Sequence, residues 1–203
     1  RTFDLKAVVI ACGTVSTTAI DVLAAENDIP VLGVVEPSAR RAAQATRNGR
    51  IGLIGTQASI RSGAYEKYIE AESPGVQVLA KACPLFVPLV ENGRIHPGDA
   101  VIETVCAEYL QPLKDAGVDT LVMGCTHYPV YRPALEKRLP GVRMIDVGEA
   151  LAEALRPLFA ESRGTGAVEY YVTERSAAFD EIVRVMDPSL DPAAIRVENA
   201  FIQ

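Results

Sequence analysis

Two cysteines stand at the ends of short apolar runs, where their thiols could act on a substrate. Cys12 closes the apolar run in LKAVVIACGT (5–14), and Cys125 closes the run in VDTLVMGCTH (118–127). A free thiol has a pKa of about 8.5, so near neutral pH the thiol can serve as an acid and its thiolate as a base. Two facing thiols could remove a proton from one side of a chiral carbon and return one to the other side. We predict that Cys12 and Cys125 form this acid–base pair.

Polar groups beside each cysteine offer hydrogen bonds to a substrate. Thr14 and Thr126 would present hydroxyl and backbone N–H groups to a carboxylate. The competing interpretation of any lone cysteine is a small buried hydrophobic residue. That interpretation is favoured for Cys106, on the apolar stripe of a helix, and for Cys83, which precedes a proline. His96 is expected in a loop.

A Cys–His hydrolase that uses Cys125 and His127 is an alternative from a different reaction class. A nucleophilic cysteine needs an adjacent base, and the base needs a third group to orient it. The sequence names no such orienting group, and Glu91 could be a solvated carboxylate. The hydrolase alternative also leaves Cys12 without a role. We therefore rank the acid–base pair above the hydrolase.

The composition argues against several classes of function. Lys and Arg number 20 while Asp and Glu number 26, which gives a net charge of −6 and argues against a nucleic-acid-binding face. The sequence holds no run of about 18 apolar residues that would span a membrane, and no leader pattern for export. Four cysteines without a C-x-x-C spacing, in a chain with two histidines, predict no metal site and a reduced, cytoplasmic setting.

Motifs for organic cofactors are also missing from the sequence. No P-loop or G-x-G-x-x-G fingerprint follows an expected strand, and no lysine stands in an evident aldehyde-trapping context. We therefore expect catalysis without a cofactor. The chain opens with Arg1 and enters an apolar, strand-like run within a few residues, so we also expect that N-terminal sequence is missing.

Short apolar runs alternate with helical patterns along the chain. The expected strands cover residues 6–12, 31–37, 49–56, 75–83, 119–125 and 142–148. The expected helices cover residues 16–27, 64–72, 99–116, a segment from about 133, and 149–159, and the tail adds a strand at 167–174, a helix from about 176 and a strand near 195–202. We expect Ser16 and Asp99 as N-caps, Gly117 just beyond the 99–116 helix, and Pro37 at the end of a strand. The alternation predicts an α/β fold with parallel sheets flanked by helices.

The two cysteines occupy equivalent places in this expected fold. In parallel α/β sheets the functional site lies beyond the carboxyl ends of the strands. Cys12 and Cys125 each follow a strand at that end. We therefore expect two similar lobes that face each other across a cleft, with one thiol from each lobe.

The motif LVMGCTHYP (121–129) resembles the second cysteine motif of the glutamate racemases, and VVIACGTVS (8–16) resembles the first. Residues 33–65 and 82–93 are also similar to that family, and the resemblance runs from about Leu5 to the end of the chain. It identifies the chain as a member of the aspartate/glutamate racemase superfamily of cofactor-independent isomerases. It implies an enzyme that interconverts L- and D-glutamate and supplies D-glutamate for bacterial peptidoglycan.

The matching positions imply a role for each residue of the motifs. Cys12 and Cys125 match the two acid–base thiols. The positions that match substrate contacts are Gly13, Thr14, Thr126 and His127. His127 is also placed to assist Cys125, and Glu91 matches a glutamate that tunes the site.

The resemblance also implies a domain organisation. Residues 35–147 correspond to the second lobe, and residues 1–34 with 148–203 correspond to what remains of the first. Glutamate is the small-molecule partner that the resemblance implies. Members of the family often form homodimers, although nothing in the sequence marks an interface.

Two departures from the family pattern leave alternatives open. The first motif usually reads C-N-T, whereas here Gly13 stands between Cys12 and Thr14, so the substrate loses a side-chain amide. The family's opening D-S-G and Y-G segments have no counterpart and would precede Arg1. The alternatives are a related two-cysteine isomerase that acts on aspartate, hydantoins or substituted malonates, and a truncated, non-catalytic binding domain.

Overall fold

The computed structural model describes residues 4–161 and 183–184. The strands in this part of the chain are β1 (Val8–Ile10), β2 (Val31–Gly33), β3 (Arg50–Gly55), β4 (Gln77–Ala82), β5 (Thr120–Met123) and β6 (Arg143–Asp146). The helices are α1 (Gly13–Thr18), α2 (Ile20–Ala25), α3 (Val35–Ala45), α4 (Gln57–Ser62), α5 (Ala64–Glu72), α6 (Phe86–Glu91), α7 (Ala100–Asp115), α8 (Arg132–Arg138) and α9 (Val147–Phe159), with the short 3-10 helix η1 (Tyr128–Tyr131). The two strands expected in the tail lie outside the described residues, and of the helix expected from about 176 only residues 183–184, which are helical, are described.

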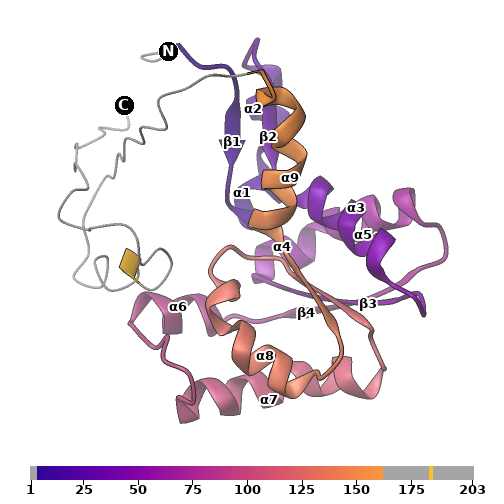
Figure 1. Ribbon diagram of the computed structural model, residues 1–203, viewed down its shortest axis with the longest axis vertical. Coiled ribbons are helices and arrows are strands. Elements are labelled where there is room, and N and C mark those ends of the chain that lie inside the picture. Colours follow the sequence, from indigo (N-terminus) through magenta and orange to yellow (C-terminus); the bar gives the residue numbers. More distant parts are fainter. Residues whose placement is uncertain (1–3, 162–182, 185–203) are drawn as a thin grey trace.

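Two parallel sheets organise the described chain. β1 pairs with β2, and a four-stranded sheet has the order β4-β3-β5-β6. In the larger sheet Ile51 of β3 lies between Val78 of β4 and Thr120 of β5, and Thr120 in turn lies opposite Arg143 of β6. Figure 1 shows the β1–β2 pair beside α9 in its upper part and the four-stranded sheet in its lower part. The α/β class with parallel sheets and flanking helices is confirmed.

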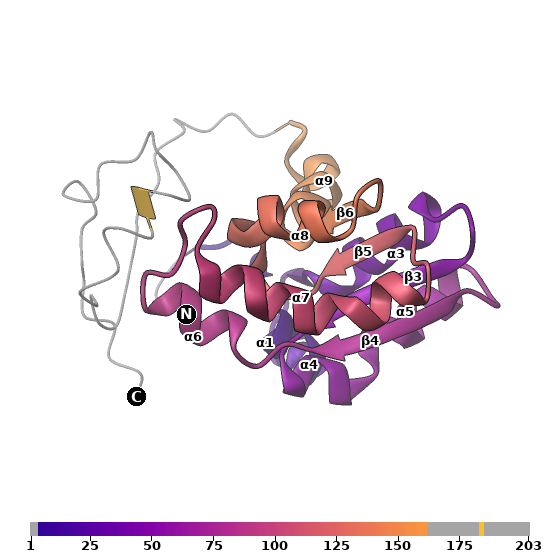
Figure 2. The same cartoon turned by 90° about the horizontal axis from the view of Figure 1, so that it is seen from below.

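Helices cover both faces of the four-stranded sheet. Leu121 and Met123 of β5 pack on one face with residues of α6, α7, η1 and α8. Val122 points to the other face, where it packs with residues of α3, α5 and α9. Because side chains alternate along a strand, one continuous apolar run supplies both cores. Figure 2 shows α7 extended along the sheet. Among the described helices, none combines the length and apolar character needed to cross a membrane.

Local side chains set the ends of the longest helix as the sequence predicts. The Asp99 carboxylate accepts the backbone N–H groups of Val101 at 2.8 Å and Ile102 at 3.3 Å, which makes Asp99 the N-cap of α7. Gly117 follows the helix with a φ of +66°, a left-handed conformation that glycine adopts without steric cost. Both expected ends of this helix are confirmed.

Two expectations about local structure are wrong. Cys12 and not Ser16 is the N-cap of α1, and the buried Ser16 hydroxyl inside that helix donates to the Ile10 carbonyl at 3.1 Å. Pro37 does not close a strand, since β2 ends at Gly33 and the proline lies in the first turn of α3. A first-turn residue needs no N–H partner within the helix, so proline is tolerated there. Helices α3, α4 and α6 were not expected from the sequence.

Candidate active site

Cys12 stands where strand β1 passes into helix α1. As the N-cap residue it has an extended backbone, with φ −135° and ψ 121°, and its carbonyl accepts the N–H of Ser16 at 2.9 Å. Its side chain is exposed. The strand-to-helix turn therefore presents this thiol beyond the carboxyl end of β1, as expected from the sequence.

Cys125 stands just beyond the carboxyl end of β5, and only 7% of it is exposed. The N–H of the preceding Gly124 donates to the Ile54 carbonyl at 2.8 Å, which continues the pairing of β5 with β3. The Cys125 carbonyl accepts the N–H of Tyr128 at 3.0 Å, where η1 begins. Hydrogen bonds on both sides thus fix the backbone that carries this thiol.

The two cysteine segments are in direct contact through their neighbouring glycines. A Cβ atom added to Gly13 would approach the Gly124 carbonyl oxygen to well under 3.0 Å, a distance that real Cβ atoms essentially never show. Glycine at position 13 therefore allows a backbone approach that a Cβ atom would prevent in this backbone arrangement. The negative charge of an ionised Cys12 also raises the pKa of Cys125. The structure brings the two predicted acid–base residues, from separate sheets, into one site.

The two threonines beside the cysteines take different positions. The Thr14 hydroxyl shares a 2.9 Å hydrogen bond with the Thr56 hydroxyl, which also contacts the Ser59 hydroxyl at 3.0 Å. This interaction ties α1 to the start of α4. Thr126 instead lines a cavity together with Arg132 and Asp146, at the carboxyl ends of β5 and β6.

A chain of polar side chains leads from Cys125 to the end of α6. The Cys125 Sγ atom lies 3.7 Å from His127 Nδ1, and His127 Nε2 lies 3.4 Å from Glu91 Oε1. The imidazole is therefore placed between the thiol and a carboxylate, and it could exchange a proton with the thiol. Glu91, which the resemblance singled out, therefore lies where its carboxylate could orient the imidazole.

Burial is the main influence on the acidity of Cys125. It raises the pKa of the Cys125 thiol to about 11, because a thiolate is poorly solvated there. The backbone N–H of His127 donates to the sulfur and lowers the pKa, whereas the negative charges of Cys12 and Glu91 raise it. In the unliganded protein this thiol is thus held in its protonated, acidic form at neutral pH.

The other two cysteines lie in the core. Cys83 and Cys106 are 1% and 0% exposed, and burial raises the pKa of each thiol to about 12. The Cys83 thiol contacts the Lys81 carbonyl at 3.6 Å. Both positions agree with the structural role that the sequence favoured. Within the described ranges, no three His, Cys, Asp or Glu side chains lie close enough together to hold a metal ion.

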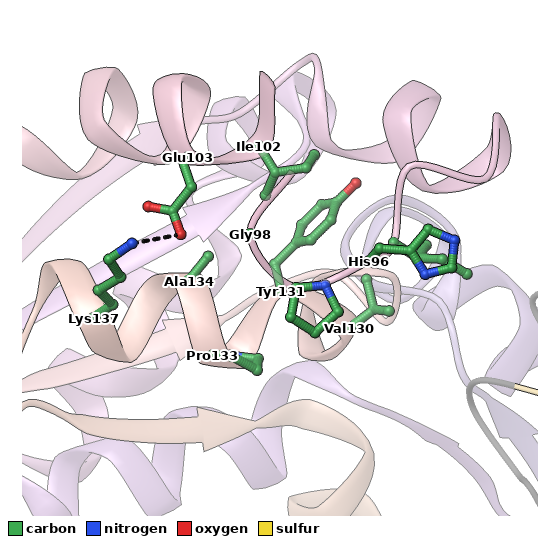
Figure 3. A pocket seen from close by; sticks show the side chains of 11 residues that line it. His96, Gly98, Ile102, Glu103, Val130, Tyr131, Pro133, Ala134 and Lys137 are labelled. Carbon is green, nitrogen blue, oxygen red and sulfur yellow. Dashed lines mark ion pairs between the residues drawn. The ribbon is translucent and has the colours of Figure 1, made fainter. Parts of the chain in front are cut away.

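His96 lies in the loop between α6 and α7, as expected, and lines a pocket of about 250 Å³. Figure 3 shows this pocket between the first turn of α7 and the η1–α8 segment, with Tyr131 projecting between them. The ion pair between Glu103 and Lys137, at 3.0 Å, closes one end. None of the predicted site residues lines this pocket, so His96 is not assigned a role in the cysteine site.

Tyr65 is a site residue that sequence reasoning missed. Its side chain is completely buried, and its hydroxyl donates to the Gly124 carbonyl at 3.3 Å, next to Cys125. A tyrosine at the start of an amphipathic helix is indistinguishable in sequence from an ordinary core aromatic residue. Only the fold shows which backbone group its hydroxyl contacts.

The chain as a whole is similar to proteins of known family. A sequence model of the family described as Asp/Glu/Hydantoin racemase matches residues 3–155. A glutamate racemase from Persephonella marina is 41% identical over 180 residues, which cover 89% of this chain and 68% of the relative. The crystal structure of a glutamate racemase isoform from Bacillus anthracis matches with a TM-score of 0.86 at 31% identity, over 98% of this chain and 75% of that one. A glutamate racemase from Francisella tularensis, crystallised in complex with D-glutamate, matches with a TM-score of 0.85 at 28% identity, over 97% of this chain and 74% of that one.

Proposed function

The chain belongs to the Asp/Glu/Hydantoin racemase family and is an isomerase, and on this premise we propose that it interconverts L- and D-glutamate by a two-thiol acid–base mechanism. The observation that carries the proposal is the contact between the Gly13 and Gly124 backbones, which brings the Cys12 and Cys125 segments together. The substrate class is supported by two relatives, 41% and 43% identical to this chain, that are glutamate racemases. A further glutamate racemase, 28% identical, was crystallised with D-glutamate.

In the proposed reaction, the thiolate of one cysteine removes the α-proton of glutamate, and the electron pair of the broken C–H bond passes into the carboxylate. The thiol of the other cysteine then donates its proton to the opposite face of the α-carbon. The product is the mirror-image amino acid, and each cysteine ends in the protonation state that the other began with. The reverse reaction uses the same groups with exchanged roles, as microscopic reversibility requires.

The neighbouring residues would support this proton transfer. We assign contacts with the substrate to Gly13, Thr14, Thr126 and His127, the first through its backbone N–H. His127 also lies where it can take up or return the proton of Cys125, at 3.7 Å from the sulfur. Glu91 would orient His127 and tune the acidity of the site.

The Cys125–His127–Glu91 arrangement by itself resembles that of a Cys–His hydrolase, because it holds a nucleophile, a base and an orienting carboxylate. The proximity of the Cys12 segment favours the racemase, since a hydrolase would give a second thiol no task. Family membership favours the same choice.

Several finer features complete the proposal. Residues 35–147 would form one lobe, and residues 1–34 with 148–203 would belong to the other. A role in supplying D-glutamate for peptidoglycan follows from the proposed reaction, and a cytoplasmic location agrees with four cysteines that are all free thiols. A homodimer stays a prediction from the resemblance.

Chiral analysis of the reaction products tests the proposal. The full-length protein, dialysed against a chelator, is incubated with L-glutamate or L-aspartate without pyridoxal phosphate. We expect D-glutamate to form, at a rate well above that of D-aspartate. Faster turnover of aspartate would assign the enzyme to the alternative substrates, and activity that depends on an added metal or on pyridoxal phosphate would contradict the two-thiol mechanism.

A further inference from the structure

Buried hydrogen bonds hold the Cys12 segment and the Cys125 segment in place. From the bond at the Cys125 segment we infer that Tyr65 is a positioning residue, whose hydroxyl holds the Gly124 peptide and thereby fixes Cys125 relative to Cys12. The inference rests on the proposed two-thiol function. It adds to that function a residue that forms no hydrogen bond with either thiol.

The hydrogen bonds at the Cys12 segment run from helix α1 to the start of α3. Ser16 lies four residues after Cys12, and its hydroxyl donates to the Ile10 carbonyl at 3.1 Å. The same oxygen accepts the N–H of Val34 at 3.2 Å. Ser16 and Val34 are 3% and 0% exposed, so these bonds are shielded from water. The helix that Cys12 caps is therefore tied to the residue that precedes α3.

A separate hydrogen bond holds the Cys125 segment from α5. The Tyr65 hydroxyl donates to the Gly124 carbonyl at 3.3 Å. Tyr65 is 0% exposed, so this bond is also shielded from water. It ends at the peptide bond that carries Cys125.

Two further observations indicate that the Tyr65 hydrogen bond serves the site and not only the core. The Gly124 carbonyl oxygen that Tyr65 contacts is the same oxygen against which Gly13 packs, so one atom is contacted from both α5 and α1. In addition, negative charge on either Cys12 or Cys125 raises the pKa of the Tyr65 hydroxyl, which places both thiols near it. Burying the Tyr65 hydroxyl would be costly if an apolar side chain sufficed there, because the hydroxyl needs a partner.

The test compares two tyrosine variants of the full-length protein. Tyr65→Phe removes the hydroxyl and keeps the ring. Tyr131→Phe is the matched control, because Tyr131 is 3% exposed and its hydroxyl donates to the Arg94 carbonyl at 3.0 Å, away from the cysteines. We expect Tyr65→Phe to lower kcat for glutamate about tenfold while KM changes less than about twofold, the pattern of a lost positioning interaction. Equal kcat values for the two variants would overturn the inference.

A second measurement does not depend on racemase activity. Alkylation by iodoacetamide, followed by mass spectrometry of the Cys12 and Cys125 peptides, reports each thiol separately. In Tyr65→Phe we expect Cys125 to react about threefold faster, because its backbone is released, while Cys12 reacts at the wild-type rate. An unchanged Cys125 rate would contradict the inference even if the wild-type protein turned out not to racemise glutamate. Failure of the wild-type protein to racemise glutamate would contradict the proposed function alone.

Discussion

Gly13 packs against the carbonyl oxygen of Gly124 so closely that a Cβ atom at position 13 would clash with it. Each glycine is the immediate neighbour of a predicted acid–base cysteine. The oxygen is a backbone atom of a residue whose N–H is paired with β3, so it cannot move aside as the end of a flexible side chain would. In this chain the close approach of the two cysteine segments therefore depends on the absence of a side chain at position 13, where the related motif usually has asparagine.

Replacing Gly13 with alanine should separate the two cysteine segments. Alanine is the better helix former within α1, so a loss of activity would not come from weakened helix formation. We expect kcat to fall about 100-fold, since misplacement of reacting groups by roughly 1 Å has that effect. The measurement is the rate of glutamate racemisation, monitored by circular dichroism.

Gly148→Ala is the control for this substitution. Gly148 also lies in a helix, α9, but an added Cβ there would meet only the Asp146 side chain, at 3.2 Å. We expect this variant to keep wild-type activity. Similar activities of the Gly13→Ala and Gly148→Ala proteins would show that the close approach is not needed.

The raised pKa of Cys125 predicts how its reactivity depends on pH. Because burial raises that pKa to about 11, the thiolate fraction is small at neutral pH and increases about tenfold per pH unit below the pKa. Alkylation of Cys125, read from its peptide by mass spectrometry, should therefore accelerate from pH 7 to pH 9 without levelling off. A plateau below pH 9 would show that the unliganded site stabilises the thiolate.

Glu91 offers a separate test of the electrostatics. Its negative charge raises the pKa of Cys125, so Glu91→Gln should lower that pKa and move the alkylation profile to lower pH. Glu153→Gln is the control, because Glu153 is an exposed carboxylate on α9 that pairs with Arg41. A shift to higher pH in Glu91→Gln would contradict this effect of the Glu91 charge.

Sequence patterns predicted the features that depend on neighbouring residues. Asp99 and Gly117 end α7 through contacts and torsions within a few residues, so their types were sufficient to place the helix. The buried Cys106 followed from its place on an apolar stripe. The strands of the larger sheet were recognisable because continuous apolar runs are typical of strands covered on both faces.

Features that depend on tertiary contacts escaped prediction. Ser16 has the type of an N-cap, but its hydroxyl bonds to Ile10 and Val34 across the fold. The contact of Gly13 with Gly124 joins residues from separate sheets, and no local pattern encodes it. The same holds for Tyr65, whose partner lies 59 positions away in the chain.

The most direct measurement of the two-thiol mechanism is solvent deuterium labelling by the Cys12→Ser and Cys125→Ser variants. A serine hydroxyl is far too weak an acid to supply an oxyanion base at neutral pH, so each variant should lose racemisation. The remaining thiolate could still exchange the α-proton of the one enantiomer whose proton it faces. Cys106→Ser, which changes a fully buried core thiol, serves as the control and should still racemise glutamate. In heavy water, we predict that the two variants incorporate deuterium into opposite enantiomers of glutamate without inverting them. Labelling of the same enantiomer by both variants, or near-normal racemisation by either, would contradict the facing-thiol mechanism.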